Sequence, residues 1–237
     1  MRHVKHMLAI VGLGATMSLL GCAGRAFAAQ SAPYPNMAPI AEYLAPSRAD
    51  EIALARSAAP PSVANDAEVL VLGAKGYETA AKGNNGFVCA VVRAWANNFD
   101  SADFWNPHVR APHCFNAAAV RTVLPTYLRR TKLALSGASR DQIREQTNSA
   151  LAAHEIPPPE TGAMAYMLSK DGYLGDNVHG HWHPHVMLYL PRTPPATWGA
   201  NARGSPIFAD ADGLEPVTVF FVPVGRWSDG TADDMPH

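Results

Sequence analysis

The sequence predicts a single α+β domain with an antiparallel sheet of about five strands and two to four helices. Runs of β-branched and aromatic residues occupy residues 68–95 and 162–222, and the stretch between them carries helix signals. No internal repeat is present in the sequence. Without the first 29 residues, about 208 remain, which suits one domain with a sizeable core.

Residues 1–29 have the three parts of an export signal. A positively charged start precedes an apolar run over residues 7–20, and Ala26-Phe27-Ala28 supplies a cleavage site. The apolar run of about fourteen residues is too short to cross a bilayer. No other segment is apolar enough, so no transmembrane helix is expected in the mature chain. The stretch before Cys22 resembles a lipobox, which makes lipidation of Cys22 the alternative. We expect a periplasmic or secreted protein, or else an outer-membrane lipoprotein with a lipid anchor.

The charge balance argues against nucleic acid as a partner. The signal holds three basic residues and no acidic one, so 16 Lys and Arg remain against 20 Asp and Glu. This mature balance of −4 is the opposite of a nucleic-acid-binding surface. Phosphate-binding glycine patterns are also missing from the sequence.

Apart from Cys22, the chain has two cysteines, Cys89 and Cys114. An even pair in an oxidising compartment favours a disulfide, with a reactive or metal-binding thiol as the alternative. Such a bond requires the two Cα atoms to lie within about 7 Å. Because Cys89 falls inside an expected strand, the bond would join the sheet to the segment that follows.

Residues 30–46 are rich in Ala and Pro and lack apolar periodicity, so we expect a linker or a wrapping arm. The α+β domain then covers residues 47–237. Ser47 is expected to cap its first helix. Asp50 and Glu51 in the first turn suit the positive end of the helix dipole.

Three strand signals follow, in residues 68–73, 76–83 and 86–95. The turn Gly83-Asn84-Asn85-Gly86 contains an Asn-Gly pair, which is a strong hairpin signal because both residues tolerate positive φ. We therefore expect the last two of these segments to be hairpin partners.

Residues 96–115 hold four aromatic side chains without a clear period, which indicates an ordered, functional or packed loop. A helix is expected from Ala117, with a break at Pro125 because proline lacks a backbone donor. Ser139 and Gln142 form a capping box that begins another helix.

Residues 162–169, 185–190 and 217–222 are expected to be three strands of one antiparallel sheet. The Pro- and Gly-rich loop over residues 191–206, with Trp198, would flank the second of them. We expect this loop to cover the mouth of that strand.

Four of the ten histidines lie within seven residues, at every second position: His179, His181, His183 and His185. A strand has a side-chain period of two, so an extended backbone would turn all four to one face. Neutral imidazole suits Zn, Cu, Fe and Ni, and closely spaced histidines are a cue for metal. We expect a divalent metal site here, with Zn as the ion.

The ends of this row lie about 20 Å apart in an extended strand, so one ion cannot take all four ligands unless the chain bends. Gly180 and Pro184 favour a bend, followed by a regular strand from about His185. His108 and His113 are candidate additional ligands from outside this strand. Met164 and Met167 are expected to be core residues and not copper ligands.

Known metal patterns do not fit the row. HExxH is absent, the residue before His185 is Pro184 where metallo-β-lactamases have Asp, and the cupin Glu is missing. The HxH spacing also occurs on a strand of α-carbonic anhydrases, a likeness of geometry alone. The segments SRADEIALARSAAPPSV, NGFVCAVVRAW, FWNPHVRAPHCFN and GHWHPHVMLYLP resemble a family of exported bacterial proteins of unknown function. This resemblance covers most of the mature chain and implies no known activity.

Three hypotheses remain open. The first is a metal-dependent hydrolase, in which an ion activates water and Glu155, Glu160 or Asp176 acts as base or orients a ligand. The second is a non-catalytic periplasmic module that binds a metal ion or small molecule. The third is a structural domain in which the histidines pack against Trp182 and Trp198.

Overall fold

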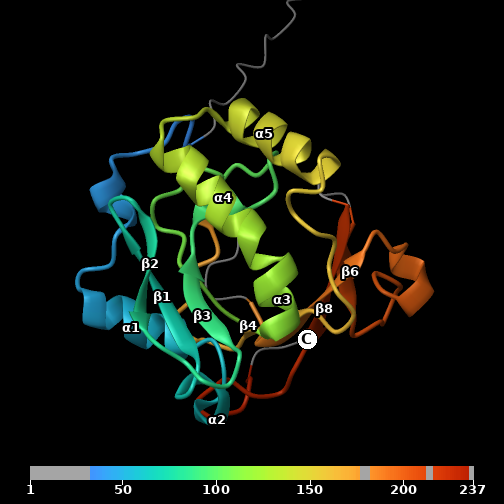
Figure 1. Cartoon of the computed structure of the whole chain (residues 1–237). Helices are drawn as coiled ribbons and strands as arrows, with labels where there is room; N and C mark the ends of the chain where they lie inside the picture. The colour runs from blue at the N-terminus through green and yellow to red at the C-terminus, as the bar shows by residue number, and fades with distance from the viewer. Residues whose placement is uncertain (1–32, 177–181, 212–215, 235–237) are drawn as a thin grey trace, which may run out of the picture. The chain divides into compact units, whose positions relative to one another are not determined.

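The computed structural model describes residues 33–176, 182–211 and 216–234. Within them, eight strands form one mixed sheet: β1 (Glu68–Gly73), β2 (Gly76–Ala81), β3 (Val88–Val92), β4 (Ala111–Phe115), β5 (Met164–Met167), β6 (His185–Pro191), β7 (Phe208–Asp210) and β8 (Val217–Pro223). The strand order is β2-β1-β3-β4-β5-β6-β8-β7 (Figure 1). All neighbouring pairs are antiparallel except β1 and β3.

Helices lie on both sides of this sheet. The α-helices of the described residues are α1 (Arg48–Arg56), α2 (Pro61–Ala64), α3 (Ala117–Thr122), α4 (Leu124–Leu135) and α5 (Arg140–Ala152). Short 3-10 helices cover η1 (Ile40–Tyr43), η2 (Ala94–Ala96) and η4 (Pro195–Trp198). The α+β class is thus confirmed, but the described residues form eight strands where about five were expected, five α-helices where two to four were expected, and one parallel pair.

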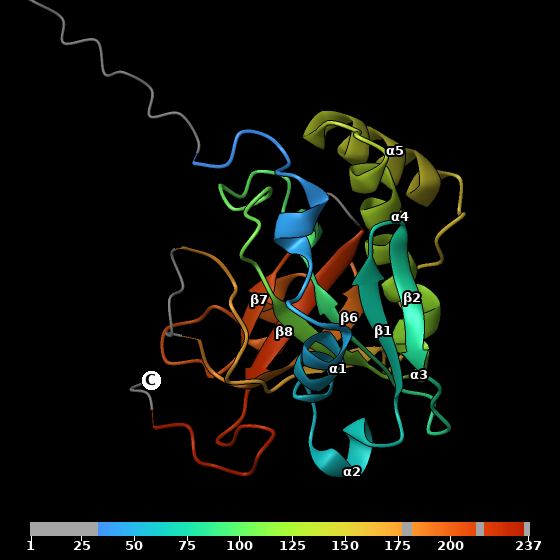
Figure 2. The ribbon, with the colours of Figure 1, turned by 90° about the vertical axis from the view of Figure 1, so that its left-hand side faces the viewer.

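The two faces of the sheet bury different cores because side chains alternate along each strand. Val69, Cys89 and Val91 pack with residues of α1 and α2 on one face. Val88, Ala90 and many others pack beneath α3 and α4 on the opposite face. The two views show α1 on one side of the sheet and α3 and α4 on the other (Figures 1 and 2).

The expected hairpin at the Asn-Gly turn is wrong. β2 does pair with β1 through a tight turn, but β3 returns to the far side of β1 and runs parallel to it. The connecting loop crosses the start of β1, where Asn84 N donates to Asp66 O and Glu68 N donates to Phe87 O. Gly86 adopts a positive φ of 78°, but Asn85 does not, so the pair does not form the hairpin turn that its sequence predicts.

The first helix forms as its cap predicts, since the Ser47 side chain accepts from Asp50 N. Glu51, however, is a buried residue and not a surface charge. Its carboxylate accepts two hydrogen bonds from Arg93, at 2.9 and 2.8 Å. Upstream, the described part of the expected arm packs onto the domain, where Tyr43 is fully buried and donates to Trp105 O at 2.7 Å.

The helical middle of the chain follows its sequence signals. Asn116 caps α3, and α4 begins at Leu124 with Pro125 in its first turn. Both hydrogen bonds of the predicted capping box, between Ser139 and Gln142, are present at the start of α5. Residues 111–115, expected to belong to a loop, instead form β4 between β3 and β5.

The C-terminal strands form the antiparallel order expected of them, with β6 between β5 and β8. β6 begins at His185, where the proline before it predicts a start. Trp198 does not cover this strand end as expected. Trp198 stacks on Phe220. Phe220 pairs with Leu188, whose side chain lies on the face of the sheet opposite to that of His185, so Trp198 packs on that opposite face.

The predicted disulfide between Cys89 and Cys114 is confirmed. The two residues are direct partners on β3 and β4, with their Cα atoms 4.0 Å apart. Across the part of the chain that the structure describes, no helix is long and apolar enough to cross a membrane. The signal segment and Cys22 lie outside the described residues.

Candidate functional site

The structure separates the predicted metal ligands. His179 and His181 lie outside the described residues. His108 is exposed in the loop before β4, whereas His113 is buried within β4. Among residues 33–176, 182–211 and 216–234, no group of three or more His, Cys, Asp or Glu could hold a metal ion.

Two of the predicted histidines lie in one row across the sheet, on strands that flank β5. Met167 on β5 pairs with His185 on β6, and Cys114 on β4 pairs with Tyr166. In the antiparallel pairing of β4 with β5, the residue before Cys114 lies opposite the residue after Tyr166, so His113 lies opposite Met167. One row across three strands therefore reads His113, Met167, His185, with all three side chains on the face beneath α4.

The row opens into a cavity of about 210 Å³ between the sheet and α4. Its wall contains the imidazoles of His113 and His185 and the phenol of Tyr127. Apolar walls come from Met167, Met187, Leu174 and Phe221. The site is thus a largely apolar chamber with two imidazoles in its wall.

His185 is held by one backbone hydrogen bond and by edge-to-face contacts with Trp182 and Phe221, at centroid distances of 5.8 and 5.5 Å. Its Nδ1 lies 2.7 Å from the carbonyl oxygen of His183, and a carbonyl only accepts, so Nδ1 carries the proton. The other ring nitrogen, Nε2, then exposes a lone pair. Nε2 is buried and has no hydrogen-bond partner among the described residues. Burial also lowers the pKa of this imidazole, so it is neutral near pH 7.

His113 is held in the same way. Its Nδ1 lies 2.9 Å from the carbonyl oxygen of Ala111, which fixes the proton on Nδ1 and the lone pair on Nε2. The ring stacks on Phe115 with centroids 5.3 Å apart. Burial lowers the pKa of His113 to about 4, and the proximity of the His185 imidazole lowers this pKa further. Both imidazoles are therefore neutral acceptors in one cavity.

His183 has a different environment. Its Nδ1 lies 2.6 Å from a carboxylate oxygen of Asp233, whose side chain is fully buried. His183 does not line the cavity of His113 and His185. The described histidines of the predicted row thus point to separate surroundings, because the regular strand begins only at His185.

The carboxylates expected to assist catalysis lie elsewhere. Asp176 accepts hydrogen bonds from Tyr34 at 2.8 Å and from Tyr173 at 2.5 Å. Glu155 pairs with Arg129, and Glu160 pairs with Arg121, at exposed positions. None of these three carboxylates lines the cavity.

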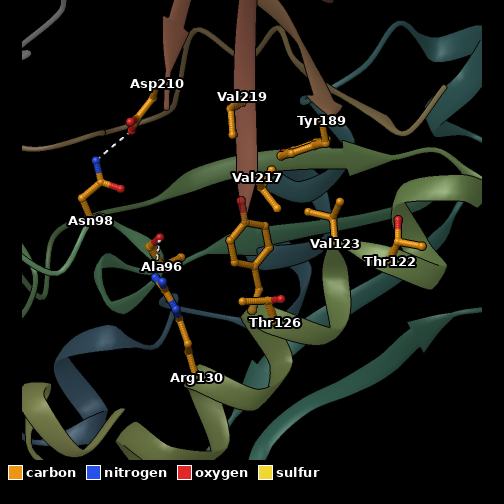
Figure 3. Close-up of a pocket in the computed structure, with 11 residues that line it drawn as sticks. Ala96, Asn98, Thr122, Val123, Thr126, Arg130, Tyr189, Asp210, Val217 and Val219 are labelled. Atoms are coloured by element: carbon orange, nitrogen blue, oxygen red, sulfur yellow. Dashed lines mark hydrogen bonds between the residues drawn. The ribbon is translucent and has the colours of Figure 1, made fainter. Parts of the chain in front are cut away.

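A smaller cavity of about 100 Å³ adjoins the first, and Ala96 and Tyr127 line both. Figure 3 shows its other walls, with Val217 and Val219 from β8 facing residues of α4. At its edge, Asn98 donates to Asp210 at 2.7 Å. This bond ties the loop after η2 to β7.

The sequence does not predict that Met187, Met167 and Tyr127 line the site. A signal for the first was available, because Met187 follows His185 by two residues and so shares its face of the strand. The position of Tyr127 depends on the packing of α4 across the sheet, which has no local signature.

No family model matches the chain, and neither a curated protein nor a solved structure matches it. Function is therefore inferred from the geometry of the cavity alone.

Proposed function

We propose that the protein is an exported, non-catalytic binding protein that holds one metal ion between His113 and His185. The observation that carries this proposal is the buried Nε2 of His185, a residue of the cavity wall, since this atom has no hydrogen-bond partner among the described residues. A buried acceptor left unsatisfied costs about 1 to 3 kcal/mol. A bound ligand would remove that cost.

The orientation of the two rings favours a metal as the ligand. Histidines that bind metals donate their other ring N–H to a carbonyl or carboxylate, which fixes the tautomer. His113 and His185 both have this arrangement, with the carbonyls of Ala111 and His183. Burial keeps both rings neutral, and a metal ligand must be unprotonated.

The cavity walls favour binding over catalysis. Metal-assisted hydrolysis needs a base within hydrogen-bond reach of the bound water. Glu155, Glu160 and Asp176 all have partners outside the cavity. Export is supported by the Cys89–Cys114 disulfide, since such bonds persist in oxidising compartments.

The test is the metal content of the full chain, purified without a His tag and measured by mass spectrometry after equilibration with first-row metals. His113→Ala/His185→Ala is the cavity variant. The matched control is His108→Ala/His154→Ala, which removes two exposed histidines. A third variant, His179→Ala/His181→Ala, removes the first half of the predicted row. Circular dichroism checks that each variant folds.

We expect near-stoichiometric metal in the wild type and in the control, and little in the folded cavity variant. Metal that survives in the cavity variant but disappears with His179 and His181 would overturn the proposal. Absence of metal from the wild type would also overturn it and leave a small organic ligand as the occupant of an apolar cavity.

A further inference from the structure

The cavity has two thioethers beside its imidazoles. Met167 stands between His113 and His185 in the cross-strand row, and Met187 is the next residue of β6 on the same face. Both methionines are 4% exposed, so their sulfurs are shielded from water. Tyr189 donates to the sulfur of Met187 at 3.7 Å, which leaves Met167 as the better placed of the two for a ligand.

A shared ion requires the two imidazoles to lean toward each other over β5. Alternate strands of a sheet lie about 10 Å apart, so imidazoles that lean inward from β4 and β6 can meet above β5. The side chain of Met167 rises from β5 between them. An ion above this strand would face two imidazole nitrogens and one sulfur.

The charge of the ligand set selects the ion. Two neutral imidazoles and a thioether carry no charge, and the described lining residues include no carboxylate. Arg93 also lines the cavity, and its guanidinium binds Glu51. A buried divalent ion would therefore lack a compensating anion, which is costly in an apolar site. The free energy of desolvation is smaller for a monovalent ion than for a divalent one. Thioether sulfur also prefers Cu(I) to Zn(II).

We infer that the ion held in this cavity is Cu(I), bound by the Nε2 atoms of His113 and His185 and by the sulfur of Met167. This inference rests on the proposed metal-binding function and names its ion. It revises the expectation that Met167 is only a core residue, since the sequence does not show which side chains lie next to it across the sheet.

The test compares Cu(I) and Zn(II) affinities of the full chain under anaerobic conditions. Cu(I) is supplied in ascorbate and measured by competition with bicinchoninate, and Zn(II) is measured with a chromophoric chelator. The variant is Met167→Leu. Its control is Met164→Leu, the same substitution on the same strand but on the opposite face, where Met164 pairs with Leu188.

We expect Met167→Leu to lower the Cu(I) affinity by about tenfold or more, which even loss of an outer partner can cause. Met164→Leu should leave the affinity unchanged. X-ray absorption of the Cu(I)-loaded wild type should show a sulfur scatterer that is missing from Met167→Leu.

These measurements distinguish failure of the Cu(I) inference from failure of the proposed metal-binding function. If Zn(II) binds through the two histidines and Met167→Leu changes neither affinity, the Cu(I) inference is wrong while the metal-binding function stands. If neither ion binds the wild type, both are wrong.

Discussion

Arg93 and Glu51 form an ion pair with side-chain exposures of 0% and 3%, and it joins β3 to α1. The guanidinium also donates to the carbonyls of Tyr43 and Val91. We predict that Glu51→Ala lowers the free energy of unfolding by about 3 to 5 kcal/mol, because it leaves a buried charge without a partner. Urea unfolding of the folded variant measures this loss.

The matched control is the exposed pair of Arg48 and Glu78, with side-chain exposures of 49% and 61%. Glu78→Ala should cost about 1 kcal/mol or less, as is usual for surface pairs. Equal losses in the two variants would show that the Arg93 pair is solvated in solution, contrary to the structure.

His113 should make stability depend on pH in the metal-free chain. The folded state keeps this imidazole neutral down to about pH 4, while in the unfolded chain it takes up a proton near pH 6.5. The unfolded state thus binds more protons between these values, so the free energy of unfolding falls as the pH drops through them. At about 1.4 kcal/mol per pKa unit, the loss is about 3 kcal/mol.

Urea unfolding at pH 7 and pH 4.5, with a chelator present, measures this dependence. The His113→Gln variant has no titrating group there and should show a smaller loss. The exposed His108→Gln variant should behave as the wild type. A His113→Gln variant with the full pH dependence would contradict the prediction.

At the residue scale, the sequence predicted only part of the set of residues that line the cavity. Period-two spacing identified His185, and its proline neighbour predicted where the strand begins. His113 was a candidate metal ligand only because it is a histidine, since residues 96–115 show no clear side-chain period that would predict its orientation. Its position beside Met167 and His185 depends on the pairing of three strands that are far apart in sequence.

At the scale of elements, the loop between β2 and β3 determines the topology of the first half. Gly83 lies against the start of β1, where an added Cβ would be 2.5 Å from the carbonyl carbon of Ala67 and closer still to Glu68 N. Backbone cannot move aside as a flexible side chain can. We predict that Gly83→Ala costs about 1 to 3 kcal/mol, the range typical of overpacking.

Thermal and urea unfolding measure that cost. Gly225→Ala is the control, because its added Cβ would meet nothing within 4 Å and its φ is not in the left-handed region. If Gly83→Ala is as stable as this control, the loop does not cross β1 as closely as described.

The disulfide between β3 and β4 closes a loop that includes η2 and the aromatic segment after it. Its cysteines are 25 residues apart. A cross-link over a loop of this size stabilises a protein by about 3 kcal/mol, mainly by restricting the unfolded chain. We predict a loss of this order in Cys89→Ala/Cys114→Ala, measured by urea unfolding without reductant. A variant as stable as the wild type would contradict the prediction.

Local signals predicted the elements that depend on local physics. The predicted caps at Ser47 and Ser139 and the predicted break at Pro125 are all present in the structure. β4 was not predicted because Pro112 and His113 are poor strand formers, and its pairing on both sides compensates for that. The parallel crossover from β2 to β3 was also missed, since an Asn-Gly turn does not reveal which edge the next strand joins.

At the scale of the whole molecule, the two faces of the sheet are packed with different side chains. The face beneath α1 and α2 packs small side chains such as Ala55 and Ala64 tightly around the disulfide. The face beneath α4 carries larger side chains and the two adjoining cavities. The disulfide thus lies on one face of the sheet, and the cavity of His113 and His185 lies on the other.

A ligand bound only by the folded chain stabilises the whole molecule. We predict that Cu(I) at a free concentration of about 100 times its Kd raises the free energy of unfolding by about 2.7 kcal/mol. The rise should vanish when a chelator removes the ion, and it should be absent from His113→Ala/His185→Ala. Urea unfolding in ascorbate, with the ion buffered by bicinchoninate, measures it.

The control His108→Ala/His154→Ala should keep the full stabilisation, because both histidines are exposed and lie outside the cavity. Equal stabilisation of the cavity variant would mean that the ion binds elsewhere on the folded chain. Destabilisation of the wild type would mean that the unfolded chain, with its freed histidines and methionines, binds Cu(I) more tightly than the folded cavity does. Either result would remove the cavity as the functional site, since only preferential binding to the folded chain links the ion to this arrangement of strands.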